Sequence, residues 1–445
     1  MRWTGGAATA IVLLIVTACG SPTPSPSPSP TSGSSTSPAT SPSASGSAGT
    51  TTPVAVEGRI AVLAADSSLS VLLPDGGIAI LDDTSDGMYG FPTWSPDGAY
   101  IAAVRSDGTQ TSVVVFEAPE ASADTTQPTV IFQRPSASPF YLYWTPDSKK
   151  VSFLATENDI LSLRLAPADG SAPVDGTGDG AVVREGNPFY FDWLAPDRLF
   201  AHIGTGTDSF VGEIGLDGDA TGAGFKTPGD FRSAVVSPDQ QSVAFVRGVT
   251  GGPGEVVVSG RDGSNEHSMV VYGQTALVFD PVGGAVASIA SSDPGDLAGF
   301  PLGPLRLLDS ASGDVRTLID GSVVSFWWSP DGKTIAALRV QPRIGSATPS
   351  AAPSQEAPIE VRLIFVDVAS GKTLSQPTIQ PSERFVSSFL AYFDQYALSH
   401  RIWAPDSSAI LMSEAGEDGR TRATIRHIDG SDPIPLDGEM AFWSP

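Results

Sequence analysis

Short apolar stretches and polar turn residues alternate along the chain from about residue 57 onward, and one combination of the two recurs. In its clearest copy Phe326–Trp328 is apolar, Ser329–Gly332 interrupts the stretch, and Thr334–Leu338 resumes it. Proline presets φ for a turn, and the Asp-Gly pair tolerates a positive φ. Each copy therefore predicts a strand, a tight turn and a second strand. Its aspartates, such as Asp97 and Asp331, are predicted to form turns rather than to act as catalytic groups.

The phrase WSPDG and its weaker copies are spaced regularly. We call the first residue of each copy its anchor. The anchors are Trp94, Trp144, Trp193, Val236, Phe279, Trp328 and Trp403, and a truncated copy lies at Trp443–Pro445. Most intervals are 40 to 50 residues, and the interval from Trp328 to Trp403 is 75. A period of this length indicates one supersecondary unit used repeatedly, as in solenoids and propellers.

Each interval has room for about four strands. After Trp94, alternation and β-prone composition predict strands at Tyr100–Val104, Ser112–Glu117 and Thr129–Gln133, before Phe140–Trp144 reaches the next phrase. Four short antiparallel strands make one propeller blade. Long amphipathic helical patterns do not separate the strands, which disfavours a βαβ fold. The predicted fold class is therefore an all-β propeller.

The two ends of the repeat region complement each other. Gly58–Ala64 matches the strand that follows the phrase, and Glu439–Pro445 matches the strand that precedes it. Together they complete one module, so that the N- and C-terminal strands would close the ring without exposed edges. This predicts eight four-stranded blades. Seven blades is the alternative, because Val236 and Phe279 are the least distinctive anchors.

The repeat resembles a known family. WSPDG followed by a strand of the form xxIAxx is similar to the TolB-like propeller repeat, which also occurs in the propellers of prolyl-oligopeptidase-type enzymes, and the resemblance covers residues 57–445. It implies a fold and not an activity, since such propellers host many functions. The chain departs from TolB itself by carrying a lipobox and no separate N-terminal α/β domain. A TolB-type partner is therefore not carried over to this chain.

The N-terminus predicts export. Ala7–Val16 is uncharged, follows Arg2, and is too short to span a bilayer, which is typical of a secretory signal peptide over residues 1–18. Val16–Cys19 resembles the bacterial lipobox, which implies cleavage before Cys19 and a diacylglycerol on its sulfur. An uncleaved anchor and ordinary secretion are the alternatives.

Residues 19–56 are predicted to be a lipidated cysteine and a spacer. From 21 to 53 the sequence is rich in Ser, Pro and Thr and contains no charge. Such a composition predicts disorder because it offers little apolar area to bury. Residues 57–445 are then the propeller domain.

Composition limits the partners. The chain has 49 acidic and 25 basic residues and a net charge of −24, which disfavours nucleic acid and adsorption on anionic lipid. We expect attachment through the lipid to the extracytoplasmic face of the cell membrane. Because Cys19 is the only cysteine, no disulfide within the chain is expected. The protein is expected to be a monomer.

Catalytic and metal-binding motifs are weak. The sequence has no G-x-S-x-G elbow, and its histidines (His202, His267, His400 and His427) lie in different modules without ligand spacing. The acidic run Asp175–Gly180 lacks the spacing of an EF-hand. We therefore predict no catalytic residue, metal or cofactor. On the innermost strands only Asp192 and Arg401 carry charge, which predicts either one buried ion pair or two rim residues.

Three long connections are predicted to meet on one face. They are Ser291–Gly303, Gln341–Pro358 and Gln376–Gln395, whereas Ala118–Pro128 and Ala166–Gly180 should lie on the opposite face. The third connection contains aromatic residues at helical spacing, predicted to bind a partner: Phe385, Phe389, Tyr392 and Phe393. The alternative is a short helix packed on the rim.

These features favour a non-enzymatic, lipid-anchored propeller that binds a protein or a component of the cell envelope. One alternative is a hydrolase or lactonase-like enzyme that uses the central funnel. Such an enzyme would need carboxylates, histidines or a metal to converge there. Another alternative is a scaffold within an envelope assembly.

Overall fold

The computed structural model describes residues 56–82, 87–122, 127–178, 181–205, 209–222, 224–225, 233–248, 253–293, 300–342, 359–416 and 418–445. The predicted signal peptide and all of the predicted linker except Val56 lie outside these ranges, and so does Cys19. Within these ranges nearly all regular structure is β, as the repeats predict. No helix in this part of the chain has the length and apolar character needed to cross a bilayer.

The strands of the first half form separate antiparallel sheets. One sheet contains β29 (Met440–Trp443), β1 (Ile60–Leu63), β2 (Leu69–Leu72) and β3 (Ile78–Asp82). The next contains β4 (Met88–Trp94), β5 (Tyr100–Ser106), β6 (Thr111–Glu117) and β7 (Thr129–Gln133). A third contains β8 (Ala137–Trp144), β9 (Lys150–Glu157), β10 (Ile160–Pro167) and β11 (Val182–Glu185). A fourth contains β12 (Phe189–Ala195), β13 (Arg198–Ile203) and β14 (Phe210–Gly215).

The second half contains one long continuous sheet and one short sheet. The long sheet contains β15 (Ala234–Val236), β16 (Ser242–Gly248), β17 (Gly254–Gly260), β18 (His267–Phe279), β19 (Ala285–Ser291), β20 (Gly303–Asp309), β21 (Val315–Trp328), β22 (Thr334–Pro342), β23 (Ile359–Asp367), β24 (Thr373–Ser375) and β25 (Thr378–Ile379). The short sheet contains β26 (Ala409–Ala415), β27 (Thr421–His427) and β28 (Ile434–Pro435).

Two long strands explain the continuous sheet. The first part of β18 pairs with β17, and the part from Tyr272 onward pairs with β19. In the same way β21 pairs first with β20 and then, from Ser322 onward, with β22. Each of these strands thus ends one repeat and begins the next without a break. Both pairings include register shifts near the change of partner.

The repeated phrase forms the predicted turn. The Ser95 hydroxyl donates to Asp97 Oδ1 at 2.6 Å and accepts from Tyr100 N at 2.9 Å, while Gly98 has φ +71°. Matching hydrogen bonds join Thr145 to Asp147, Ser237 to Asp239 and Ser329 to Asp331. The hydroxyl and carboxylate therefore replace backbone partners that the tight turn leaves unsatisfied. The prediction that these aspartates form turns is confirmed.

The chain ends pair with each other. β29 runs antiparallel to β1, with Trp443 opposite Ile60 and Met440 opposite Leu63. Trp443 is buried, and its indole nitrogen donates to the Glu57 carbonyl oxygen at 2.6 Å. The C-terminal strand is therefore integrated into the N-terminal sheet.

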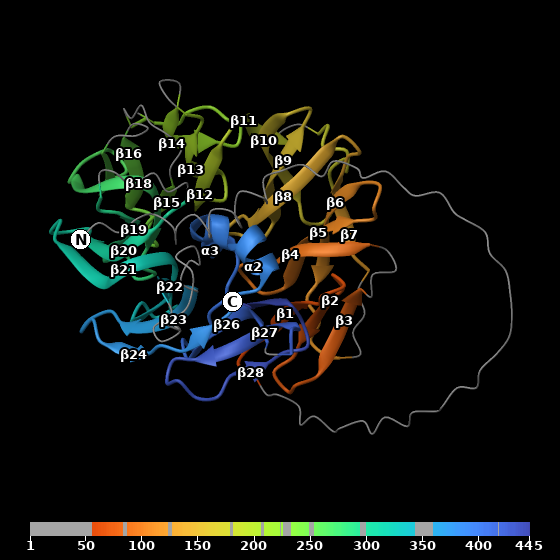
Figure 1. Ribbon diagram of the computed structural model, residues 1–445. Helices are drawn as coiled ribbons and strands as arrows, with labels where there is room; N and C mark the ends of the chain where they lie inside the picture. Colours follow the sequence, from red (N-terminus) through yellow and green to blue (C-terminus); the bar gives the residue numbers. More distant parts are fainter. Residues whose placement is uncertain are drawn as a thin grey trace, which may run out of the picture.

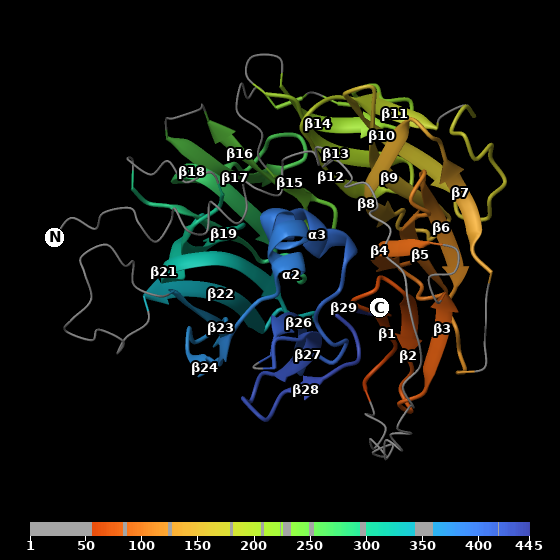
Figure 2. The ribbon, with the colours of Figure 1, turned by 45° about the vertical axis from the view of Figure 1, so that its right-hand side comes forward.

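The sheets are arranged around a centre that is occupied by helices (Figures 1 and 2). These are α2 (Glu383–Ser388), the 3₁₀ turn η2 (Leu390–Tyr392) and α3 (Phe393–Ser399), which together form the central helical segment, residues 383–399. Antiparallel alternation places this segment and the connections after β19, β22 and β26 on one face, the helix face. The repeated turns, such as Ser95–Gly98 and Ser329–Gly332, lie on the opposite face, the turn face.

Candidate binding site

A groove of about 1260 Å³ opens on the helix face. Its walls come from the connection before β20, from β21 to β23, from α2 and η2, and from β26 to β28. Its apolar lining includes Phe300, Pro301, Val324, Leu338, Val340, Val361, Ile379, Pro381, Val386, Leu390, Ala391, Ala415, Pro433 and Pro435. The groove thus combines three segments that are far apart in the sequence, and the described parts of the three predicted connections lie beside it.

Local hydrogen bonds fix the helix that forms one wall. Ser382 caps α2 by accepting from Phe385 N at 3.1 Å, and its own backbone nitrogen donates to the Ser413 carbonyl oxygen at 2.9 Å. Pro381 forms an isolated bridge with Glu414 of β26. A serine N-cap satisfies a free N–H of the first helical turn. Together these contacts hold the start of α2 against β26, so that Val386 and Leu390 line the groove.

Ion pairs line the polar side of the groove. Arg426 donates from Nε and Nη2 to both carboxylate oxygens of Glu414 at 2.8 and 2.6 Å. Arg422 donates from both terminal nitrogens to the two oxygens of Asp418 at 3.0 and 2.6 Å. The pair of Arg426 and Glu414 is well buried: the side chain of Arg426 is 17% exposed and that of Glu414 is 9% exposed. A bidentate pair of this kind holds its guanidinium in a fixed orientation.

The predicted aromatic residues are mostly core. Phe385, Phe389 and Phe393 are buried, whereas Tyr392 is 49% exposed. The prediction that all four are exposed for a partner is therefore wrong for the three phenylalanines, although it agrees with the exposure of Tyr392. The reason is the position of the helical segment. On the rim of the ring one side of the helix would face solvent, whereas at the centre that side packs against inner strands.

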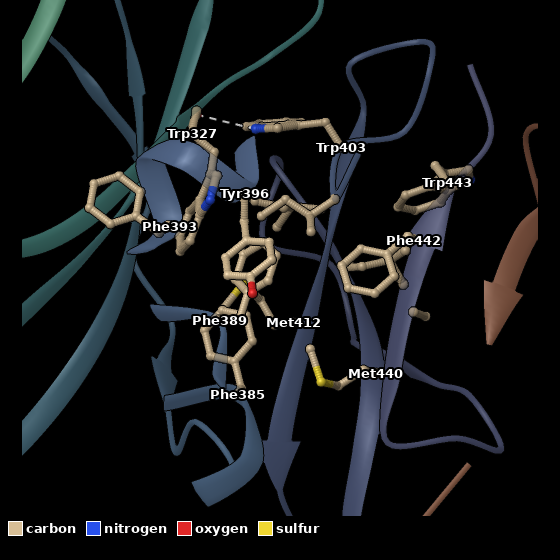
Figure 3. Close-up of a cluster of buried hydrophobic side chains, with 14 of the residues drawn as sticks. Trp327, Phe385, Phe389, Phe393, Tyr396, Trp403, Met412, Met440, Phe442 and Trp443 are labelled. Atoms are coloured by element: carbon tan, nitrogen blue, oxygen red, sulfur yellow. Dashed lines mark hydrogen bonds between the residues drawn. The ribbon is translucent and has the colours of Figure 1, made fainter. Parts of the chain in front are cut away.

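The phenylalanines pack against inner strands from different parts of the ring (Figure 3). Phe393 makes edge contacts with Trp327 at 5.8 Å and with Phe326 at 5.4 Å between ring centroids. Phe389 packs on Phe442 of β29 at 5.8 Å and stacks on Tyr396 at 5.2 Å. The central helical segment is thereby part of the largest hydrophobic core cluster.

Polar contacts also hold the segment in the centre. Tyr190 and Ser233 donate their hydroxyls to the buried carboxylate of Asp394, and the Tyr141 hydroxyl donates to the Gln395 carbonyl oxygen at 2.9 Å. Burial raises the pKa of Asp394, although the hydrogen bonds from Ser233 and Tyr190 lower it in part. Three of the inner strands, or the residues beside them, are thus hydrogen-bonded to α3. The segment closes the centre of the ring on the helix face.

The two predicted inner-strand charges do not form an ion pair. Asp192 is buried and accepts from the Tyr143 hydroxyl at 2.9 Å and from Val236 N at 2.9 Å, and burial raises its pKa to about 6. The Arg401 residue is exposed at the surface, although partial burial of its guanidinium lowers its pKa and the nearby Tyr143 opposes that effect. Asp192 is thus a satisfied core carboxylate and Arg401 an exposed residue, so neither predicted alternative holds for the two charges together.

The histidines and the acidic loop contribute no metal site among the residues that the structure describes. His202 and His400 are buried, and His267 and His427 are partly exposed. Asp175 accepts from Thr177 in a local turn, as expected for a hairpin loop. Cys19, the predicted lipidation site, lies outside the described residues.

Sequence reasoning missed the residues that make the groove. Glu414 and Arg426 pair across two strands, and Val386 and Leu390 approach them from a helix. Only the lengths of the three long connections, and the aromatic residues of the third, indicated that something lay on this face.

The chain matches no protein-family model and no curated protein. Solved structures similar to it include a prolyl endopeptidase, with 10% identity, a TM-score of 0.52, and coverage of 81% of this chain and 50% of that one. They also include the dihydro-heme d1 dehydrogenase NirN in complex with DHE, with 12% identity, a TM-score of 0.52, and coverage of 87% and 75%. TolB from Acinetobacter baumannii has 14% identity, a TM-score of 0.39, and coverage of 87% and 67%. The chain spans half the length of the endopeptidase. At these identities the likeness to the endopeptidase and to NirN concerns the fold alone, which is that of a β-propeller.

Proposed function

We propose that this protein is an exported, lipid-anchored propeller that binds a segment of a partner protein or envelope component in the groove on its helix face. The groove is the observation that carries the proposal. It is concave, largely apolar, and edged by oriented charged groups, which is the usual make-up of a binding site.

We further propose that the ring has eight blades. Dividing β18 and β21 where each changes partner separates the continuous sheet into three modules, which join the five others. The last module takes its innermost strand from the short bridge between Trp403 and Ile410. Pairing of β29 with β1 would then join the two ends of the ring.

The anchor leaves the groove accessible in this arrangement. Val56, where the described chain begins, donates its backbone N–H to the Pro74 carbonyl oxygen in the turn between β2 and β3. That turn lies on the turn face, as does Ser444 beside Gly58. The described chain therefore begins on the face opposite the groove, so a lipid on Cys19 need not cover the groove.

Site-specific photo-crosslinking in intact cells tests the function. Gln380 is exposed and lines the groove, so Gln380 replaced by benzoylphenylalanine should give one reproducible adduct in the full-length chain. Ser431 is equally exposed on the turn face and supplies the control position. The same adducts from both positions, or none from Gln380, would rule out the groove as the binding site.

A further inference from the structure

We infer that Arg306 and Ser288 hold a small monovalent anion, such as chloride, at the place where β20 approaches β18. This site lies outside the groove and does not depend on the proposed function. The reasons are two free donor atoms on the arginine, the absence of the partners that an equivalent arginine has, and a free hydroxyl on the neighbouring strand.

The side chain of Arg306 has two donor atoms without a partner. Its Nε and Nη2 atoms are buried, and neither forms a hydrogen bond with any residue that the structure describes. Its Nη1 atom approaches the Val270 carbonyl oxygen at 3.5 Å, which is a weak contact. Burial lowers the pKa of Arg306, and no charged group in the described part of the chain opposes this shift. Because a guanidinium stays protonated in proteins, the site contains a positive charge that no neighbour compensates.

Arg164 occupies the equivalent position in another module. Arg164 of β10 lies opposite Phe153 of β9, nine residues after the anchor of its module. Arg306 of β20 lies opposite Ser288 of β19, which is also nine residues after its anchor. The partners of the two arginines can therefore be compared position by position.

Both of the free donor atoms have partners in Arg164. Its Nε donates to Ser162 Oγ at 3.1 Å, and its Nη2 donates to Glu157 Oε2 at 3.0 Å. The corresponding residues in the other module are Pro304, which has no hydroxyl, and Ser292, which has no carboxylate. The sequence thus lacks both partners there, and an anion from solution would take the part of the missing carboxylate.

The neighbouring strand supplies a further donor. Side chains that lie directly opposite each other in an antiparallel pair share a face, so Ser288 stands beside Arg306 as Phe153 stands beside Arg164. The Ser288 hydroxyl is fully buried and has no partner among the described residues. Serine in place of phenylalanine therefore offers a hydroxyl to an anion and removes the bulk of a ring.

Geometry and burial limit the anion to a small one with a single charge. Nε and Nη2 form the edge of the guanidinium with which Arg426 and Arg261 of this chain hold carboxylates. One negative charge compensates one guanidinium, whereas a divalent anion would leave a buried charge without a partner. Since both donor atoms are buried, a large anion would have to separate the strands to reach them. Ser292 is exposed just after the end of β19, so a small anion would enter from the helix face.

Thermal unfolding of the full-length lipidated protein in detergent micelles tests the site, with sodium chloride and sodium gluconate compared at equal ionic strength. Gluconate is monovalent but too large for a buried site. The melting temperature should be about 2 °C higher in chloride, because a ligand that binds only the folded state stabilises it. Equal melting temperatures in the two salts would overturn the inference.

Two variants and one control connect the effect to Arg306. Ser292→Glu supplies the missing carboxylate at an exposed position, so this variant should melt at the same temperature in both salts. Arg306→Gln removes the charge and should also abolish the difference. Ser431→Glu adds a carboxylate at an exposed position of the turn face and should keep the response of the parent protein. A chloride response that persists in Ser292→Glu or Arg306→Gln, or one that disappears in Ser431→Glu, would show that chloride acts elsewhere.

Discussion

The indole nitrogen of Trp94 donates to the Phe442 carbonyl oxygen at 3.0 Å, although the two residues lie at opposite ends of the propeller sequence. The same contact recurs along the chain. Trp144 donates to the Thr93 carbonyl oxygen at 3.1 Å, and Trp403 donates to the Trp327 carbonyl oxygen at 3.2 Å. In each case the acceptor directly precedes the anchor of another module. The anchor tryptophans therefore connect neighbouring sheets by hydrogen bonds as well as by packing.

Replacing Trp94 by Phe should lower the free energy of unfolding by about 1–3 kcal/mol beyond the loss of packing, because a buried carbonyl oxygen loses its donor. Trp193→Phe is the matched control. Trp193 is also buried, but its indole nitrogen has no partner among the described residues, and the Tyr143 carbonyl oxygen accepts from Ser152 instead. Urea denaturation should show a smaller loss for Trp193→Phe. Equal losses would mean that these hydrogen bonds add nothing.

The fold could be predicted because its information is local and repeated. Proline, aspartate and glycine define each turn, and the apolar stretches beside them define the first two strands of a module. The predicted strands Ser112–Glu117 and Thr129–Gln133 agree with β6 and β7 within one residue. The continuous strands β18 and β21 were not predicted, since nothing local distinguishes a strand that changes partner from two strands.

The burial of Phe385, Phe389 and Phe393 could not be predicted for a different reason. Helical spacing shows that aromatic side chains share a side, but it does not show what that side faces. A segment on the rim would expose one side to solvent, whereas this one lies among inner strands. The groove depends on the same placement, and on the cross-strand pair of Glu414 and Arg426.

Phe389→Ala should destabilise the protein by about 3–5 kcal/mol, the usual effect of removing a fully buried ring. Phe389 is 0% exposed and stacks on Phe385 and Tyr396. Tyr392→Ala, at an exposed position of the same segment, should change the melting temperature very little. If both variants melt like the parent protein, the central helical segment does not stabilise the ring.

Lipidation is expected at Cys19. Metabolic labelling with an alkyne fatty acid should mark the parent protein and leave Cys19→Ser unlabelled, because the thioether requires the sulfur. The substituted protein should also move from the membrane fraction to the supernatant after lysis, since no other membrane attachment is proposed. Label on both forms would show that the lipid is attached elsewhere.

His400 should make the protein acid-sensitive. It is enclosed by Phe442, Tyr396, Phe389 and Phe91, and burial lowers its pKa to about 4. A histidine whose pKa is lower in the folded state contributes stability above its unfolded pKa, near 6.5, and loses it as the pH falls toward 4. A tenfold difference in proton affinity between the folded and unfolded states corresponds to about 1.4 kcal/mol. His400→Phe keeps a ring in the site and should reduce the loss of stability between pH 6.5 and 4 by about 3 kcal/mol.

Asp192 should act in the opposite direction over nearly the same range. Its pKa is raised to about 6, mainly by burial, so the folded protein binds a proton more tightly than the unfolded chain does. The resulting stability is fully present below about pH 4 and is lost as the pH rises through 6. In the parent protein the contributions of Asp192 and His400 should therefore partly cancel.

Comparison of Asp192→Asn with the parent protein isolates the Asp192 contribution. The amide of this variant does not titrate. It lowers the free energy of unfolding by an amount that does not depend on pH, because one of its atoms faces Val236 N, which donates to the carboxylate in the parent protein. The pH dependence of the difference in free energy of unfolding between variant and parent is thus more informative than the size of that difference. Relative to the parent, the free energy of unfolding of the variant should rise by about 2 kcal/mol between pH 4 and 7, because the folded carboxyl binds its proton roughly a hundredfold more tightly than the unfolded one. Urea denaturation at closely spaced pH values measures this difference. A difference that stays constant across the range would mean that Asp192 titrates as an ordinary carboxylate, and that the Tyr143 hydroxyl and the backbone donors compensate for its burial completely.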